Sequence, residues 1–195
     1  MDIQKIENVT VMFADIDDFY DYSRQRPAEQ FLSALDAFFS CFDEVAERFH
    51  LRKIKTIGDA YMCAGGIPAA CLSHPADVVR AALDVQQHLN RLRKQNPDLW
   101  TVRFGVHTGE VYAGFLGKTE LTYDIWGATV NLAARIESMC PKGKILISNT
   151  TFDRVKNDFT CEYAGALPEK LGKGELYLID NGQLTIDNES LLNHY

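Results

Sequence analysis

The sequence is short of cysteine pairs, of basic charge and of long apolar runs, and each shortage argues against a class of protein. Its five cysteines are scattered and form no CxxC pair, which argues against a disulfide framework and against a zinc site. The net charge of −7 is opposite to the basic footprint of a nucleic-acid binder, so we expect no nucleic acid among its partners. No apolar run approaches the ~18 residues needed to cross a bilayer, so we expect no membrane contact from this segment.

The N-terminus lacks the features of a secretory signal. The first ten residues, MDIQKIENVT, have neither the basic start nor the apolar block of a signal peptide. We therefore expect buried, reduced thiols and a cytoplasmic location, either for the chain itself or for a longer protein of which it is a cytosolic piece.

The chain has the size and composition of one globular domain. Its 195 residues are 46% hydrophobic and 24% charged, which is enough for a sizeable core. No repeat, low-complexity segment or obvious linker divides it. We predict a single domain over residues 1–180 and a loose C-terminal tail over residues 181–195, where no periodic pattern is found.

Apolar periodicity predicts alternating strands and helices. Residues 9–16, VTVMFADI, are β-branched and apolar and end in acidic residues, as a buried strand would. Between Phe31 and Phe49, apolar residues recur at steps of four and three, which indicates a helix with one apolar stripe. The same reasoning predicts strands at 9–16, 51–57, 60–66, 144–148 and 174–180, two strands within 100–117 joined at Thr108-Gly109, and helices after Pro27, after Pro75 and over 126–140.

This order predicts an α+β fold. Strand, helix, strand, strand, helix, strand is the βαββαβ arrangement of a ferredoxin-like sheet, with its helices on one face and additional elements towards the C-terminus. A doubly wound parallel fold is the alternative. The hairpin predicted over residues 51–66 counts against it, because such folds alternate strand and helix throughout.

Two aspartates are candidates for a metal site. Asp15 lies at the end of the first predicted strand, and Asp59 lies at the tip of the predicted hairpin. In a ferredoxin-like sheet these strands can be neighbours, which would bring both carboxylates to one edge. Carboxylates and backbone carbonyls suit Mg²⁺ or Mn²⁺, and paired ions can assist a phosphoryl displacement. The alternative is structural, with Asp15 and Asp17 capping a loop and Asp59 serving a Gly-Asp turn.

Four longer strings carry a family resemblance. They appear in the order VMFADIDDF, KIKTIGDAYM, RFGVHTGEVYAGFLG and YDIWGATVNLAARIES. Over roughly residues 8–180, the chain resembles the catalytic domain of the class III nucleotide cyclases, in particular the adenylate cyclases. The resemblance implies a ferredoxin-like domain that works as a homodimer, with two active sites in the interface between the subunits. Such domains usually stand behind sensor or membrane segments, so a regulatory domain in a longer parent chain is compatible with the sequence.

The resemblance implies a metal site and a phosphate loop near the first strand. Asp15, Ile16 and Asp59 match the metal-binding positions, with two Mg²⁺ or Mn²⁺ ions in each active site. The loop that follows approaches the triphosphate with its backbone amides, which makes Phe19 a predicted substrate-binding residue. Family members commonly have glycine where this chain has Asp18, so Asp18 adds a negative charge to the loop.

The resemblance also implies how the nucleoside is held. Lys55 and Asp124 match the pair that recognises adenine, and a lysine donor with an aspartate acceptor complements the N1 acceptor and N6 donor of that base. Asn131 and Arg135 match the pair that orients the ribose and stabilises the transition state. Their i, i+4 spacing places them on one face of the helix predicted over 126–140. The metal residues come from one subunit and these four from its partner.

A triphosphate-binding lysine is expected near the C-terminus. The family often has a KGKG string there, whereas this chain has LGKG at residues 171–174, with Leu171 in place of the expected lysine. Lys170 and Lys173 are therefore the candidates for this role.

The implied reaction converts ATP to 3′,5′-cyclic AMP and pyrophosphate. The ribose 3′-oxygen attacks the α-phosphorus, so positioning and charge stabilisation are sufficient and no covalent nucleophile is needed. One alternative is a catalytically weak or inactive module that keeps the fold, binds ATP and dimerises. The other is a guanylate cyclase, which would favour glutamate at position 55 and a small polar residue at position 124.

Overall fold

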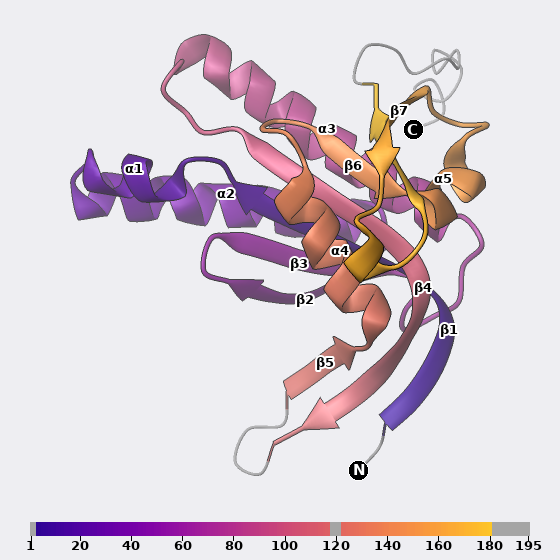
Figure 1. The fold of residues 1–195 in the computed structure, drawn as a ribbon. Coiled ribbons are helices and arrows are strands. Elements are labelled where there is room, and N and C mark those ends of the chain that lie inside the picture. Colours follow the sequence, from indigo (N-terminus) through magenta and orange to yellow (C-terminus); the bar gives the residue numbers. More distant parts are fainter. Residues whose placement is uncertain (1–2, 118–121, 181–195) are drawn as a thin grey trace, which may run out of the picture.

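A mixed sheet forms the centre of the computed structural model, which describes residues 3–117 and 122–180 (Figure 1). Its strand order is β2-β3-β1-β4-β6-β8-β7, and β5 pairs with β4 off this path. The strands are β1 Ile3–Ile16, β2 Arg52–Ile57, β3 Ala60–Gly65, β4 Val102–Leu116, β5 Thr122–Trp126, β6 Ile145–Ser148, β7 Cys161–Ala166 and β8 Glu175–Ile179. The helices are α1 Phe19–Arg24, α2 Ala28–Arg48, α3 His74–Gln95, α4 Ala128–Met139, α5 Asn149–Val155 and the short 3₁₀ helix η1 Glu169–Leu171.

The predicted α+β, ferredoxin-like arrangement is confirmed. The elements β1, α2, β2, β3, α3 and β4 follow one another in the βαββαβ order. The helices of this core, α2 and α3, pack on one face of the sheet, which we call the α2/α3 face. Helix α4 is an additional element and packs on the opposite face, which we call the α4 face.

The side chains of β1 pack alternately on the two faces of the sheet. Met12 and Ala14 belong to the cluster on the α2/α3 face, whereas Val11 and Phe13 belong to the cluster on the α4 face. Because side chains alternate along a strand and both faces are covered, the strand reads as an unbroken apolar run. This run carries Asp15 to the end of the sheet.

The prediction of two strands within residues 100–117 is wrong. Residues Val102–Leu116 form the single long strand β4, and its hairpin partner is β5, further along the chain. Gly109 does not turn the chain. It makes room for α4 instead, because a Cβ added at Gly109 would lie 2.5 Å from Oγ1 of Thr129. Sequence alone could not separate a turn glycine from one required by a close helix.

Other parts of the chain differ from the sequence reading in smaller ways. Strand β1 begins at Ile3 rather than at residue 9, and a bulge separates its two parts between Ile6 and Val9. Helices α1 and α5, η1 and strands β5 and β7 were not predicted. The predicted tail, residues 181–195, lies outside the described residues. In the part of the chain that the structure describes, no helix is long and apolar enough to cross a membrane.

The cysteines are free thiols, as predicted, but they are not all buried. Cys63 and Cys140 are buried, Cys41 and Cys161 are partly buried, and Cys71 is exposed. Only the buried ones fit the expectation drawn from the sequence.

Candidate active site

The sheet brings the predicted metal residues Asp15 and Asp59 close together. Strand β1 pairs antiparallel with β3, and Asp15 lies opposite Ala60, the neighbour of Asp59. Burial, the largest cause, and repulsion from Asp59 and Glu137 together raise the pKa of the Asp15 carboxyl to about 6. Two neighbouring carboxylates thus share the end of the sheet.

Arg103 is a charged residue at this place that the sequence reading missed. It lies opposite Asp15 on β4, and its guanidinium donates to Asp15, to Asp17 at 3.3 Å and to Glu137 of α4. Its attraction lowers the pKa of Asp15 and so opposes the effects of burial and repulsion. A single arginine within an apolar strand was the available signal, but only the register showed that it faces Asp15.

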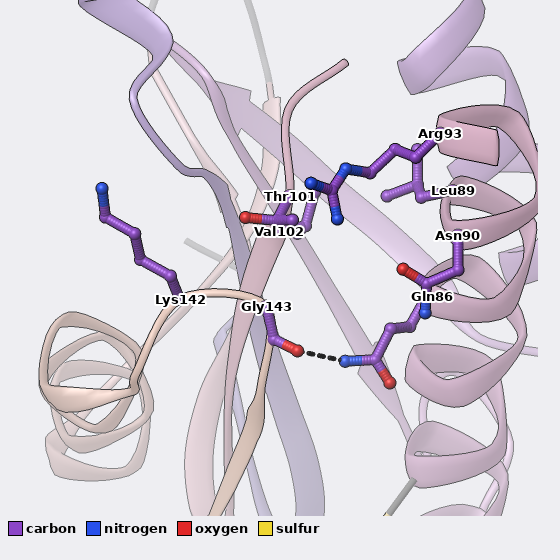
Figure 2. Close-up of a pocket in the computed structure, with 8 residues that line it drawn as sticks. All are labelled: Gln86, Leu89, Asn90, Arg93, Thr101, Val102, Lys142 and Gly143. Atoms are coloured by element: carbon purple, nitrogen blue, oxygen red, sulfur yellow. Dashed lines mark hydrogen bonds between the residues drawn. The ribbon is translucent and has the colours of Figure 1, made fainter. Parts of the chain in front are cut away.

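Asp17 has a structural part in the site. Its carboxylate is buried and accepts hydrogen bonds from Thr101 Oγ1 at 2.6 Å and from the Gly143 amide at 2.9 Å. A pocket of about 190 Å³ opens beside these two residues, and Figure 2 shows the Gln86 amide donating to the Gly143 carbonyl across it. None of the predicted site residues lines this pocket. Asp17 thus joins the end of β1 to the distant segments that carry Thr101 and Gly143.

The apolar residues on either side of the loop after β1 pack against the protein. Ile16 is only 2% exposed, and the Phe19 ring packs against Phe31 with centroids 5.2 Å apart. Asp18 adopts the left-handed conformation, with φ 59°, which explains why glycine suits this position. Its exposed carboxylate accepts two hydrogen bonds from Lys142 Nζ, at 2.5 and 2.6 Å, so the extra negative charge has a partner.

The predicted base-recognition residues Lys55 and Asp124 meet directly. They come from β2 and β5, and the Lys55 ammonium donates to Oδ2 of Asp124. The other oxygen of Asp124 accepts the Ile125 amide at 2.8 Å, which holds the carboxylate in orientation. The pair therefore places a donor beside an acceptor. The side chains alone join the two strands here, because β2 pairs with β3 and β5 pairs with β4.

Lys53 and Lys55 do not share a face of β2, although residues two apart on a regular strand point to the same side. A bulge lies between them: Lys53 is paired with Cys63, on the α2/α3 face, and Lys55 is paired with Met62, on the α4 face. The residue between them, Ile54, is the extra residue of the bulge. The bulge therefore turns Lys55 to the side opposite Lys53.

Asn131 and Arg135 lie exposed on one face of α4. Neither side chain forms a hydrogen bond or ion pair with any residue in 3–117 or 122–180, so both are available to a ligand or partner. The opposite face of α4 packs tightly on β4. A Cβ added at Gly105 would lie 2.1 Å from the Glu137 nitrogen, so Gly105 fixes the position of the helix.

The C-terminal lysine candidates are also exposed. Lys170 lies in η1 and Lys173 in the segment before β8, and within the described chain neither forms an ion pair. Leu171 instead packs beside the apolar cluster that contains Leu167 and Leu176. The leucine at the expected lysine position therefore has a packing role.

The predicted metal site consists of two aspartates. Among the described residues, no group of three or more His, Cys, Asp or Glu side chains is arranged to hold a metal ion. Asp15 and Asp59 supply two hard carboxylates that repel one another, a donor set that fits Mg²⁺ or Mn²⁺ when water and phosphate oxygens complete the coordination.

Comparisons with known proteins agree on the nature of the domain. The family model described as the adenylate and guanylate cyclase catalytic domain matches residues 1–181. An adenylate cyclase of Mycobacterium tuberculosis is 34% identical over 178 residues, which cover 90% of this chain and 40% of that protein. The chain therefore spans less than half the length of this relative.

Solved structures are similar over almost the whole chain. The adenylyl cyclase CyaB from P. aeruginosa has a TM-score of 0.88 at 26% identity and covers 96% of this chain and 100% of its own. The catalytic core of a rhodopsin-guanylyl cyclase with converted specificity, in complex with ATPalphaS, has a TM-score of 0.85 at 31% identity and covers 91% and 97%. An adenylyl cyclase and a guanylyl cyclase with converted specificity are thus both similar to this chain.

Proposed function

Because the chain belongs to the family of adenylate and guanylate cyclase catalytic domains, we propose that it is an adenylate cyclase. It converts ATP to 3′,5′-cyclic AMP and pyrophosphate, and the catalytic domain spans residues 1–180. The proposal goes beyond the family in one respect, the choice of adenine over guanine. The ion pair between Lys55 and Asp124 carries that choice.

Hydrogen-bond polarity favours adenine at this pair. Adenine presents an acceptor at N1 and a donor at N6, whereas guanine presents a donor at N1 and an acceptor at O6. Lys55 supplies only donors and Asp124, when ionised, only acceptors. A base with the reverse order leaves buried polar groups unpaired, and such mismatches can cost a substrate ~10⁴-fold in selectivity. Asp124 is only 16% exposed, so water compensates the mismatch poorly.

Each active site takes its residues from two copies of the chain. One subunit supplies Asp15 and Asp59, and its partner supplies the Lys55–Asp124 pair and the exposed face of α4 with Asn131 and Arg135. The exposure of that face supports this arrangement, because neither side chain is used within the described chain. The result is a homodimer with two equivalent sites.

The residues then divide the chemical work. Asp15 and Asp59 bind the metal, and Ile16 contributes through its backbone carbonyl because its side chain is buried. Two Mg²⁺ or Mn²⁺ ions held there would supply positive charge to offset the negative charge of the transferring phosphate and to lower the pKa of the attacking 3′-hydroxyl.

Four further residues position the ribose and the phosphates. Asn131 orients the ribose, and Arg135 stabilises the charge that develops on the α-phosphate. The backbone at Phe19 and one of Lys170 and Lys173 bind the triphosphate.

A direct assay tests the proposal. Purified protein is incubated with ATP or GTP and with Mg²⁺ or Mn²⁺ over a series of protein concentrations, and the cyclic products are separated by chromatography. We expect cyclic AMP from ATP, with a specific activity that rises with protein concentration as dimers form. Asp15→Asn, Asp59→Asn and Arg135→Ala should each lower the rate at least ~100-fold while the circular dichroism stays that of the wild type.

Two other outcomes contradict the proposal. If GTP is the better substrate, the chain is a guanylate cyclase and the reading of the purine pair is wrong. If the wild-type dimer binds ATP but forms no cyclic product with either metal, the chain is a nucleotide-binding and dimerisation module.

A further inference from the structure

Strands β2 and β5 lie side by side although they are not neighbours in the sheet. The backbone of β2 pairs with β3, and that of β5 pairs with β4, so β3, β1 and β4 separate them in the strand order. Side chains of both strands, among them Ile54 and Tyr123, nevertheless pack against the same cluster on the α4 face. The edges of the curved sheet therefore approach each other across this face.

Two side-chain bridges span the approach. One is the ion pair between Lys55 and Asp124. The other is a cation–π contact, in which the Arg52 guanidinium lies 4.0 Å from the centroid of the Tyr123 ring. Tyr123 directly precedes Asp124, so this contact holds β5 one residue away from the carboxylate that accepts from Lys55.

Tyr123 has a second contact, with an aromatic ring. Its ring packs edge-on against Phe115 of β4, with centroids 5.4 Å apart and an interplanar angle of 69°. The ring is thus fixed to the strand that pairs with β5, while Arg52 links it to β2. A stacked guanidinium prefers the face of an aromatic ring, so the contact is directional as well as attractive.

The β2 bulge makes both bridges possible. Arg52 lies opposite Ala64 and Lys55 lies opposite Met62, and both of these β3 residues face α4. Three residues apart, Arg52 and Lys55 would point to opposite faces of a regular strand. The extra residue Ile54 turns both side chains to the face on which β5 lies.

We infer that Arg52 and Tyr123 are positioning residues for purine selection. Their stacking fixes the separation of β2 and β5, and so holds Lys55 and Asp124 at the spacing of the N1 and N6 groups of adenine. The inference rests on the proposed function, because it concerns the same base-recognition pair. It adds two residues that touch neither the base nor the reacting atoms.

The alternative is that the stacked pair only stabilises the domain. That role predicts a lower unfolding temperature in variants but an unchanged preference between ATP and GTP. The positioning role predicts that the preference itself changes. The ratio of kcat/KM for ATP to that for GTP therefore separates the two roles.

The experiment compares three variants with the wild type. Arg52→Gln and Tyr123→Leu remove the cation or the ring, and each should lower the ATP-to-GTP ratio about tenfold, the size of a well-placed cation–π contact. Most of the change should appear as a higher KM for ATP, because base binding rather than phosphoryl transfer is disturbed. Tyr123→Phe keeps the ring, so its ATP-to-GTP ratio should stay within about twofold of that of the wild type.

A matched control comes from a second contact of the same kind. The Arg26 guanidinium also lies 4.0 Å from an aromatic centroid, that of Tyr22, but this pair belongs to the α1 region. Arg26→Gln should leave the ATP-to-GTP ratio unchanged. If Tyr123→Leu fails to fold, Arg52→Gln alone decides, because Arg52 is only partly buried at a sheet edge. An unchanged ratio in Arg52→Gln, or an equal change in Arg26→Gln, overturns the inference.

Equilibrium binding keeps this inference separate from the proposed function. Dissociation constants for fluorescent ATP and GTP analogues are measured for the same variants. A wild-type protein that prefers ATP in binding but forms no cyclic product overturns the proposed function alone. In that case a lower ATP preference in Arg52→Gln still supports the positioning role, and an unchanged preference refutes it.

Discussion

Lys53 and Lys55, two residues apart on β2, bind partners on opposite faces of the sheet. The Lys53 ammonium donates to Asp43 of α2 at 2.7 Å, and the Lys55 ammonium donates to Asp124 of β5. The bulge at Ile54 separates the two directions. The hairpin thus has one lysine that ties it to a helix and one that is available to read a base.

The two lysines should therefore differ in their effect on substrate choice. Lys55→Gln keeps a donor but loses the charge and the ion pair, and we expect it to lower the ATP-to-GTP ratio of kcat/KM at least ~10-fold. Lys53→Gln is the matched control, with the same chemical change, and should leave that ratio unchanged. Equal effects of the two substitutions would show that charge on β2, rather than base recognition, determines the preference.

The β2–β3 hairpin also shows which features could be predicted from the sequence and which could not. Strands predicted at 51–57 and 60–66 agree closely with β2 and β3, because Gly58 supplies the positive φ of 63° that a tight turn requires. The opposite facing of Lys53 and Lys55 could not be predicted, because a bulge depends on the pairing with β3 and on partners such as Asp43. The alternation of side chains along a strand carries no information about either.

At the candidate site, too, some features could be predicted from the sequence and others could not. The positions of Asp15 and Asp59 at one edge followed from strand order, and the structure brings them together. Arg103 was missed because its part depends on the register between β1 and β4, which is a long-range relationship. The catalytic roles themselves remain predictions from the resemblance, and the assays above test them.

Arg103 should be important for stability. Its guanidinium binds three carboxylates, those of Asp15, Asp17 and Glu137, and the Asp17 and Glu137 side chains are almost fully buried. Arg103→Gln removes the positive charge that all three carboxylates share, so we expect a loss of about 2–4 kcal/mol in the free energy of unfolding. Urea denaturation measures it.

The control for Arg103 is an exposed ion pair. Arg48 binds Asp84 at 2.5 Å, but the Arg48 side chain is 60% exposed. Arg48→Gln should cost less than ~1 kcal/mol. A loss for Arg103→Gln no larger than that of the control would mean that solvent compensates the three carboxylates.

Gly105 should not tolerate even alanine. A methyl group there would lie 2.1 Å from the Glu137 nitrogen and 2.6 Å from the Ala133 carbonyl oxygen, and both are backbone atoms that cannot rotate away. Gly105→Ala must therefore displace α4 from β4, at a cost of at least ~2 kcal/mol. The displacement also moves Asn131 and Arg135, so cyclase activity should fall at temperatures where the variant is still folded. Normal thermal stability would contradict the tight packing of α4.

His107 should make the stability of the fold depend on pH. Burial lowers the pKa of this histidine to about 4, and its Nδ1 lies 2.7 Å from Ser148 Oγ in a hydrogen bond. In the unfolded chain a histidine takes up a proton below about pH 6.5. Its contribution is therefore complete above pH 6.5 and is lost as the pH falls from 6.5 towards 4. The free energy of unfolding of His107→Gln, measured by urea denaturation, should show a shallower slope in this interval than that of the wild type. Parallel curves would refute this assignment.

Asp18 should weaken the affinity for ATP. It occupies a left-handed position that glycine adopts without strain, and it adds a carboxylate to the loop that we expect to approach the triphosphate. In the structure Lys142 neutralises that charge through an exposed ion pair. Asp18→Gly removes the charge, relieves the backbone strain and leaves the lysine free for phosphate, so the KM for ATP should fall several-fold while the unfolding temperature changes by only a few degrees.

Asp18→Asn separates the effect of charge from that of the backbone, because it removes the charge and keeps a side chain. An equal fall in KM for both variants assigns the effect to charge, whereas a fall for Asp18→Gly alone assigns it to the backbone. An unchanged KM in both would mean that the loop does not approach the phosphates.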